Sequence, residues 1–450
     1  MAQWLRLLPF LILPATLLAD LPARVEQKTI RGFVLQLRSS TNFQVDDYRI
    51  LRTDKTRLEY QPGHEEALRI GSEVEVSGAY DPQQNLLVAE RIRVHPPPSG
   101  AVQGMAILEY PPEVIPGGLR LLCDGRKIHV GKGTQLFERK DQDSPVSMAD
   151  LHQRLRPGSY VDYSGTISLH GSVEASKIVF WKNTTEKTEA RLLAAYQPRQ
   201  HISGQGNLSR SLSVGKMRYR IYPNPIIQGY VHRVGVRLLS TFSRTGTARS
   251  PFAHLNFRFF VVDNLQPRAT AYPSGVVVVR AGLLYVVENE AQLAFLLAHE
   301  IAHTIQEHAW RQWHYQRRKL RIFRWATAYL SWVVEQAIRK GYERELENQA
   351  DRLALAYMAR AGYDPREGYQ FLRRLEKVGG IALRPLLWSS HDSFSSRRSS
   401  IMALIQTSHH DLEFSRLETN LEAFAAARLY LPETQIRTAT EQSGSGQERR

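Results

Sequence analysis

Two histidines four residues apart, with a glutamate directly after the first, have the residue types and spacing of a catalytic site. They are His299, Glu300 and His303, within the stretch LLAHEIAHTIQEH that runs from Leu296 to His308. Because positions i and i+4 share one face of a helix, both imidazoles can point at the same spot. This H-E-x-x-H spacing is typical of zinc peptidases, in which the histidines bind the metal and the glutamate is the general base.

The alternative is an accidental match, with two histidines that are simply bonded to carbonyl groups in the core. The neighbours of the motif decide between the two interpretations, because they are apolar: Leu293, Leu296, Leu297, Ile301, Ala302 and Ile305. This pattern predicts a buried helix. An ionised Glu300 buried there costs several kcal/mol unless a partner or a metal compensates. The surroundings therefore favour a metal site.

A catalytic zinc needs three protein ligands and leaves its fourth position to water. The next long helical stretch, YERELENQADRLALAYMARAGYDP, offers Glu347 and Asp351, which are four residues apart and share a face. Glu347 could complete a His₂Glu set, and Asp351 could accept the remaining N–H of a ligand histidine. Glu343 and Glu345 are alternative third ligands.

The run of valines before the motif predicts the strand that delivers substrate to this site. Val276 to Val279 are β-branched and follow a Pro-Ser-Gly turn. We expect this strand to present an open edge, to which a peptide in extended form adds as a further strand. The predicted substrate-binding residues are Val276, Val277 and Val278.

The region in front of the motif contains an internal repeat of strands and turns. In the two copies, residues 22–96 and 101–183, the glycines Gly71 and Gly78 correspond to Gly158 and Gly165. Each copy predicts a small antiparallel β-barrel of OB-like type, and the prolines of HPPPSG form the hinge between them. No titratable cluster recurs in both copies, so we expect them to bind a partner, which the sequence does not name, or to act as spacers.

The rest of the chain is divided by composition. Residues 184–204 predict a linker and residues 205–430 an α+β metallopeptidase domain. The polar tail 431–450 is predicted to be disordered. The first twenty residues, MAQWLRLLPFLILPATLLAD, predict a signal peptide, or alternatively an uncleaved membrane-surface anchor. Either interpretation places the protein outside the cytoplasm, and we expect a periplasmic location.

Charge and cysteine content narrow the classes of partner and site. The chain of 450 residues carries a formal net charge of +15, which suits contact with an anionic membrane surface. Nucleic acid is not expected, because no nucleic-acid-binding motif occurs. Cys123 is the only cysteine, which excludes a disulfide framework and a cysteine-based zinc site.

Five stretches, in this order, resemble a known family. They are NPIIQGYVHRVGVRLL, ATAYPSGVVVVRAGLL, EAQLAFLLAHEIAHTIQEHA, ENQADRLALAYMARAGYDP and SSHDSFSSRRSSI. Together they resemble the zinc endopeptidases of the CAAX prenyl protease, HtpX and Oma type (metallopeptidase family forty-eight), and most of all its soluble periplasmic BepA-like branch. The resemblance covers roughly residues 205 to 407.

The resemblance implies a gluzincin-type fold and one Zn²⁺ per chain, with His299, His303 and Glu347 as ligands and Glu300 as the catalytic acid and base. It also implies that His391 lies near the metal, where it either gates the open zinc position or stabilises the oxyanion. We expect an exported endopeptidase that hydrolyses misfolded or stalled envelope proteins. The alternative is a non-catalytic envelope assembly factor whose metal site is silent or plugged.

Overall fold

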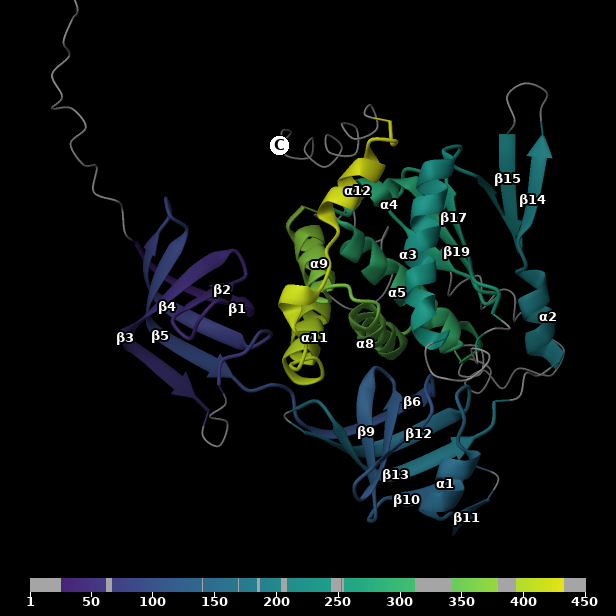
Figure 1. Cartoon of the computed structure of the whole chain (residues 1–450), viewed down its shortest axis with the longest axis horizontal. Helices are drawn as coiled ribbons and strands as arrows, with labels where there is room; N and C mark the ends of the chain where they lie inside the picture. The colour runs from purple at the N-terminus through teal and green to yellow at the C-terminus, as the bar shows by residue number, and fades with distance from the viewer. Residues whose placement is uncertain are drawn as a thin grey trace, which may run out of the picture. The chain divides into compact units, whose positions relative to one another are not determined.

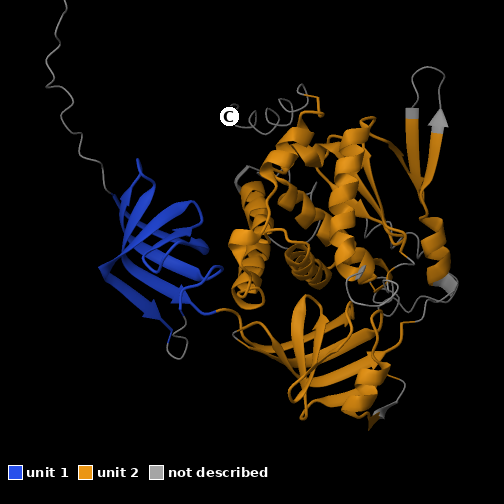
Figure 2. Ribbon diagram, in the orientation of Figure 1, with its two compact units in different colours: residues 1–96 blue, residues 97–450 orange. Residues whose placement is uncertain are grey.

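The computed structural model describes residues 26–61, 67–139, 141–168, 170–183, 187–203, 209–243, 252, 255–311, 342–378 and 394–432 (Figure 1). The chain separates into two compact units, residues 1–96 and 97–450 (Figure 2). The predicted signal peptide, His391 and the tail from residue 433 lie outside the described residues. Within those residues, no helix has the length and apolar character needed to span a membrane.

The first unit holds the first β region, in which five strands close into a barrel in the order β1-β2-β3-β5-β4. Buried and exposed side chains alternate along β4, as expected for a strand with one face on a core. The strands are β1 (Glu26–Leu37), β2 (Asn42–Val45), β3 (Tyr48–Tyr60), β4 (Glu73–Asp81) and β5 (Leu86–His95).

The second β region begins the second unit and forms an eight-stranded sheet with one helix. Its strand β6 pairs with β12, and β12 pairs with β13, which joins β9 and β10 through parallel pairing. The elements are β6 (Gly100–Ile107), β7 (Glu113–Ile115), β8 (Gly118–Cys123), β9 (Arg126–Gly131), β10 (Gln135–Glu138), β11 (Asp141–Pro145), α1 (Met148–Arg154), β12 (Tyr160–Ile167) and β13 (Val173–Trp181).

The two copies of the predicted repeat share the same local geometry at one pair of glycines. Gly78 pairs with Ala89 across β4 and β5, and Gly165 pairs with Ala175 across β12 and β13, each directly after a register shift. A Cβ at Gly78 would lie 2.1 Å from a backbone oxygen of the facing strand, and one at Gly165 would lie 2.2 Å from the equivalent oxygen. The same close approach of two strands therefore requires glycine in both copies.

The predicted order of domains, β regions first and the peptidase domain last, is confirmed. The second predicted barrel is not confirmed, because the strands of that copy form an eight-stranded sheet and not a closed barrel. The OB-like type stays a prediction for both copies.

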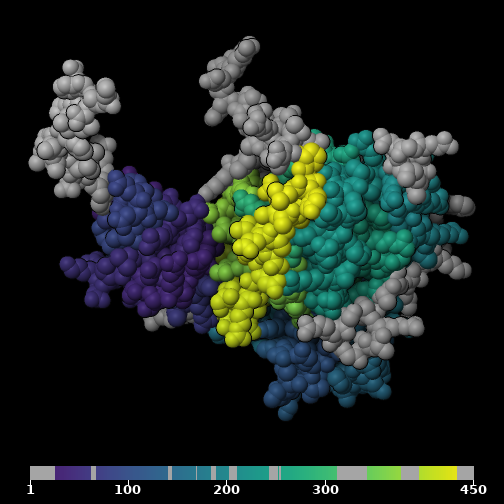
Figure 3. Space-filling model, turned by 45° about the horizontal axis from the view of Figure 1, so that its top comes forward, coloured from purple at the N-terminus to yellow at the C-terminus, as the bar shows by residue number. Residues whose placement is uncertain are grey.

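The remainder of the second unit is mainly helical and includes two three-stranded sheets. The predicted linker 184–204 contains α2 and β14. The elements are α2 (Lys187–Ala195), β14 (Arg199–Ser203), β15 (Ser209–Val214), β16 (Met217–Arg220), α3 (Pro225–Ser243), β17 (Arg258–Val262), β18 (Ala269–Ala271), β19 (Val276–Arg280), α4 (Ala281–Val286), α5 (Glu290–Ile305), α8 (Arg344–Arg360), α9 (Arg366–Val378), α11 (Phe394–Thr407), the 3₁₀ turn η1 (Phe414–Arg416) and α12 (Leu421–Arg428). Figure 3 shows the yellow C-terminal segment on the surface of this unit.

The motif helix α5 is the centre of this domain. Asn289 caps its first turn by accepting a hydrogen bond from the Gln292 backbone N–H at 2.9 Å. Nearly every side chain of α5 is buried, which confirms the prediction made from its apolar residues. The helix packs against α3, α8 and α9 and against β18 and β19.

The valine strand β19 is the middle strand of its sheet, whose order is β17-β19-β18. Val276 and Val278 belong to a core cluster with Leu192 of α2 and Leu212 of β15. The alternate residues of β19 are also buried, and burial on both faces explains the uninterrupted run of valines. The predicted open edge at Val276 to Val279 is therefore wrong, because both sides of β19 are already paired. The outer strand next to α5 is β18.

Candidate metal centre

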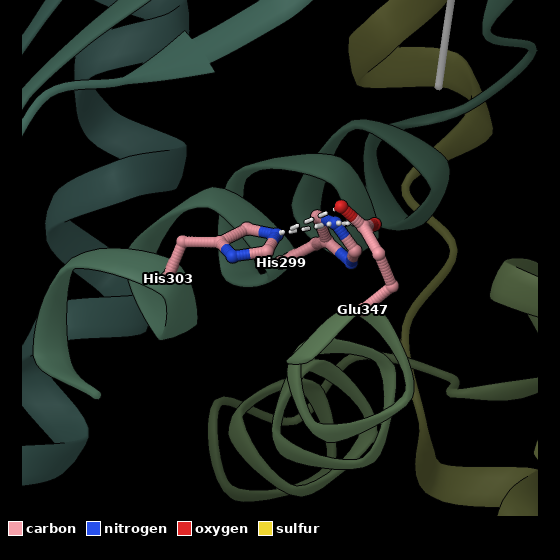
Figure 4. Close-up of side chains that lie close together, drawn as sticks. All are labelled: His299, His303 and Glu347. Carbon is pink, nitrogen blue, oxygen red and sulfur yellow. Dashed lines mark hydrogen bonds and ion pairs between the residues drawn. The ribbon is translucent and has the colours of Figure 1, made fainter. Parts of the chain in front are cut away.

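The three predicted metal ligands converge from two helices (Figure 4). His299 and His303 lie one turn apart on α5, and Glu347 lies in the first turn of α8. Their ligand atoms lie within 4.8 Å of one another, and all three residues are buried. The rival glutamates, Glu343 and Glu345, are exposed, so the register of α8 separates them from this site.

The spacing of the ligand atoms suits a metal ion. The Nε2 atoms of His299 and His303 are 3.0 Å apart. Two nitrogens bound tetrahedrally to zinc lie about 3.3 Å apart, given zinc–nitrogen bonds of about 2.0–2.1 Å. Glu347 Oε2 lies 3.3 Å from His299 Nε2 and, within the described part of the chain, is a buried oxygen that accepts no hydrogen bond. A cation at the centre would satisfy all three atoms.

The charges of the site also call for a cation. Burial would raise the pKa of Glu347, but the two histidines outweigh this effect and lower it. Burial likewise opposes ionisation of Asp351, but Arg397 and His299 lower its pKa. Two ionised carboxylates therefore lie in this buried site beside Arg397, and either a proton on His299 or a metal ion in its place balances the remaining negative charge. A divalent metal ion balances this arrangement, and the His₂Glu donor set is one that zinc uses.

The ring of His299 is oriented by a carboxylate inside the helical domain. Its Nδ1 lies 2.9 Å from Asp351 Oδ1, as predicted. Arg397 of α11 holds the same carboxylate with bonds of 2.7 Å from Nε and 2.6 Å from Nη2. Burial lowers the pKa of His299, but Asp351 and Glu347 outweigh it and raise this pKa to about 9. Arg397 belongs to the last of the five resembling stretches, but the sequence did not predict its contact with Asp351.

The ring of His303 has different neighbours. Burial and the adjacent His299 lower its pKa to about 3, so the ring is neutral, as a metal ligand must be. Tyr342 stacks on it with ring centroids 4.2 Å apart, and the Tyr342 backbone N–H donates to Glu347 Oε1 at 3.0 Å. His303 Nδ1 lies 2.7 Å from Nδ1 of His308. Sequence reasoning missed Tyr342, which no motif marks.

Glu300 lies beside the edge of the peptidase sheet. Its Oε2 accepts a hydrogen bond from the backbone N–H of Ala271 in β18 at 2.6 Å. Burial raises the pKa of its carboxyl group. The carboxylate thus follows a ligand histidine directly on α5 and is held at the outer strand, where it can exchange a proton with a reactant bound at that edge.

The comparisons with known proteins agree with this geometry. Residues 225–405 match the model of peptidase family M48, which contains all of the residues described above from α5, α8 and α11. The match identifies residues 225–405 as an M48 peptidase domain. Residues 31–93 of the first β region match a domain family of unknown function (DUF5666).

Several curated proteins resemble the M48 domain. The chain is 28% identical over 180 residues to the beta-barrel assembly-enhancing protease of Escherichia coli, covering 36% of this chain and 35% of the relative. The equivalent protease of Yersinia pestis is 30% identical over 180 residues, with the same coverage. The mitochondrial metalloendopeptidase OMA1 of Bos taurus is 31% identical over 176 residues, covering 34% of this chain and 33% of the relative. The chain thus spans about a third of the length of these relatives.

Proposed function

We propose that this protein is a zinc-dependent endopeptidase that acts on exported proteins in extended form. The observation that carries the proposal is the convergence of His299, His303 and Glu347, with the carboxylate of Glu300, next to His299 on the same helix, bonded to the edge of a β-sheet. The M48 match supports the same reaction. Zinc, when bound, polarises the scissile carbonyl and acidifies the attacking water.

The residues of the chain supply positioning and proton transfer. His299, His303 and Glu347 hold the metal, and Asp351 keeps the ring of His299 in place. Glu300 takes the proton of the attacking water and later delivers it to the leaving amine. Its burial excludes bulk water, which favours proton transfer within the site over exchange with solvent.

The outer strand β18 is the proposed docking edge for substrate. It pairs with β19 through Ala269 to Ala271, and the N–H of Ala271 points away from β19, toward Glu300. A substrate in extended form would pair with β18 and bring its backbone to the metal. Val276, Val277 and Val278 then act as support for β18 and not as direct contacts. Such recognition selects little among side chains, which suits the removal of misfolded or stalled envelope proteins.

The predicted export to the periplasm supports this biological role, as does the printed name of the Escherichia coli relative, a protease linked to β-barrel assembly. The β regions, as small barrel-like binding or spacing modules, would contact a partner or hold the peptidase domain near an anionic membrane surface.

The role of His391 is proposed to be gating of the open metal position. Its substitution by alanine should then raise basal cleavage at matched zinc occupancy. If His391 instead stabilises the oxyanion, the same substitution should lower turnover by roughly ten- to a thousandfold. The opposite signs separate the two roles, and an unchanged rate would contradict both.

The test of the main proposal is a digest of an unfolded protein such as casein by the zinc-loaded full chain and by Glu300→Gln. We expect cleavage by the wild type and a loss of roughly a hundred- to ten-thousandfold in the variant, since its general base is removed. Glu422→Gln, the same change on the exposed surface of α12, is the matched control and should cleave at the wild-type rate. Equal zinc content with no cleavage by any of the three would favour the non-catalytic assembly factor.

A further inference from the structure

A line of four buried polar side chains connects the metal site to the second β region. His303 Nδ1 lies 2.7 Å from His308 Nδ1, and His308 Nε2 lies 2.9 Å from Gln349 Oε1. Gln349 Nε2 then donates to Asp124 Oδ1 at 2.7 Å. Asp124 belongs to the turn between β8 and β9, so the line begins on a metal ligand and ends in a different region of the chain.

The orientation of the Gln349 amide is fixed by its neighbours. Its nitrogen faces Asp124 and the backbone oxygen of Met105, at 2.7 and 3.2 Å, and both of these groups only accept hydrogen bonds. Its oxygen accepts a hydrogen bond from Arg311 Nη1 at 2.7 Å. A flipped amide would place acceptor against acceptor and donor against donor. The oxygen must therefore face His308.

This orientation determines where the protons of both histidines lie. Because Gln349 presents an oxygen, His308 must carry its N–H on Nε2. With its N–H on Nε2, the His308 ring presents a bare Nδ1, and this atom accepts across the 2.7 Å contact with His303 Nδ1. His303 must then carry its proton on Nδ1, which leaves the Nε2 lone pair directed at the metal.

The far end of the line is a fixed negative charge. Asp124 accepts two hydrogen bonds from Arg352 Nη2, at 2.8 and 3.0 Å, and one from Tyr163 at 2.6 Å. Burial opposes ionisation of Asp124, but Arg352 and Arg126 outweigh burial and lower its pKa. The charge that orients the amide of Gln349 is thus held in place by both the β region and α8.

We propose that Asp124 is a positioning residue for the metal ligand His303, acting through Gln349 and His308, and that the second β region is consequently a part of the metal site. The inference rests on the metal site of the proposed function and extends it beyond the M48 match, which begins at residue 225. His299 is oriented from within the helical domain, whereas His303 is oriented from the β region.

The experiment measures metal binding by the full-length chain, so it does not depend on cleavage of a substrate. Zinc affinity is obtained by competition with a chelator, and the absorption spectrum of the Co²⁺-substituted protein reports the geometry of the site. Gln349→Leu should weaken zinc binding roughly ten- to a hundredfold and alter the Co²⁺ spectrum, as expected when the partner of a ligand histidine is lost. Asp124→Asn keeps the shape of the turn and should weaken binding about tenfold with a change of the same kind.

Two variants serve as controls. Asp46→Asn makes the same change at the equivalent turn of the first β region. Tyr160→Phe removes another hydrogen bond between the second β region and the peptidase domain, that to Glu307, without touching the line. Both should bind zinc and Co²⁺ like the wild type.

The proposal would be overturned if Asp124→Asn, shown to be folded by its thermal transition, had wild-type zinc affinity and Co²⁺ spectrum. It would also be overturned if Tyr160→Phe weakened zinc binding as much as Asp124→Asn, because general docking would then explain the effect. If Gln349→Leu does not fold, the test still stands, because Asp124→Asn alone decides the proposal. A wild type that binds zinc but cleaves nothing would contradict the proposed function and leave this inference intact.

Discussion

Equivalent turns of the two β regions have different environments. In the first region Asp46 and Asp47 join β2 to β3, and in the second Asp124 and Gly125 join β8 to β9. Asp46 is half-buried and Asp47 is exposed, whereas Asp124 is completely buried and binds Arg352 of α8. The turn of the first β region is thus partly exposed, whereas the turn of the second β region docks on α8 of the peptidase domain.

The strand edges differ in the same way. In the first region β1 pairs with both β2 and β4, which closes the barrel. In the second region the outward-facing backbone groups of β6 bond to side chains of the peptidase domain. Ile107 donates to Gln306 Oε1 at 2.7 Å and accepts from Gln306 Nε2 at 3.1 Å. In the first copy the backbone groups of this strand edge are bonded to the next strand of the barrel. In the second copy they are bonded to the peptidase domain.

The difference shows how two similar β regions can take different structural roles. The first β region forms a compact unit by itself. The second one shares buried charges and backbone hydrogen bonds with the helices that carry the metal ligands. Three substitutions test this contrast, and they are ordered here by the size of the expected effect.

Replacing Arg352 by methionine should have the largest effect on stability. The substitution leaves Asp124 buried without its main partner, which typically costs roughly 3–5 kcal/mol. In the first region Arg93 makes only partly exposed pairs with Glu59 and Glu75, so Arg93→Met should cost less than about 1 kcal/mol. Hydrogen exchange read by region is the measurement. If Arg352→Met lowered protection in residues 26–96 as much as in the second unit, the two units would unfold together. This result would contradict the comparison.

The carboxyl group of Glu109 should make the second unit sensitive to pH. Burial raises its pKa to about 8, although Arg360 and hydrogen bonds from Tyr357 and Gln306 oppose this shift. A raised folded-state pKa contributes stability that is complete below the unfolded value, near 4.5, and is lost as the pH rises through about 8. The free energy of unfolding of Glu109→Gln, measured relative to that of the wild type, should therefore rise by roughly 3 kcal/mol from pH 5 to pH 8.

Denaturant unfolding of both proteins across this pH range provides the check. Comparing the variant with the wild type at each pH cancels the contributions of the other titrating groups. A stability difference that stays constant from pH 5 to pH 8 would show that Glu109 is ionised in the folded protein, contrary to the burial argument.

The smallest effect concerns two glycines with similar backbone conformations. Gly125 has a φ of +67° and Gly117 a φ of +87°, so alanine is strained at both by roughly 1 kcal/mol. A Cβ at Gly125 would also lie 2.8 Å from the backbone carbonyl of Arg352, whereas nothing lies within 4 Å at Gly117. Gly125→Ala should therefore cost about 1–2 kcal/mol more than Gly117→Ala. Equal losses in thermal unfolding would mean that α8 does not pack closely on this turn.

The sequence was sufficient for the parts of the site whose spacing is local. His299 and His303 are one helical turn apart, and the pair Glu347 and Asp351 repeats that spacing, so helix geometry alone places each pair on one face. The structure brings all four together. The apolar neighbours of the motif likewise predicted the buried helix α5.

Long-range contacts could not be predicted in this way. The run Val276 to Val279 shows a strand buried on both faces, but no local pattern tells which strands flank it, and so its edge was misplaced. The partner of Gln349 is Asp124, which is distant in sequence and lies in a region that reads as an independent module. Arg397 was seen in its motif, but its contact with Asp351 depends on how α11 packs against α8.

The central claim of this account is that His299, His303 and Glu347 hold one zinc ion. The most direct measurement is the metal content of the purified full-length chain, with Glu347→Gln and the exposed control Glu345→Gln measured beside it. We expect about one zinc per wild-type chain, the same content in Glu345→Gln, and a loss of most of the metal in Glu347→Gln. A folded wild type that contains no zinc and takes up none on titration would contradict the account.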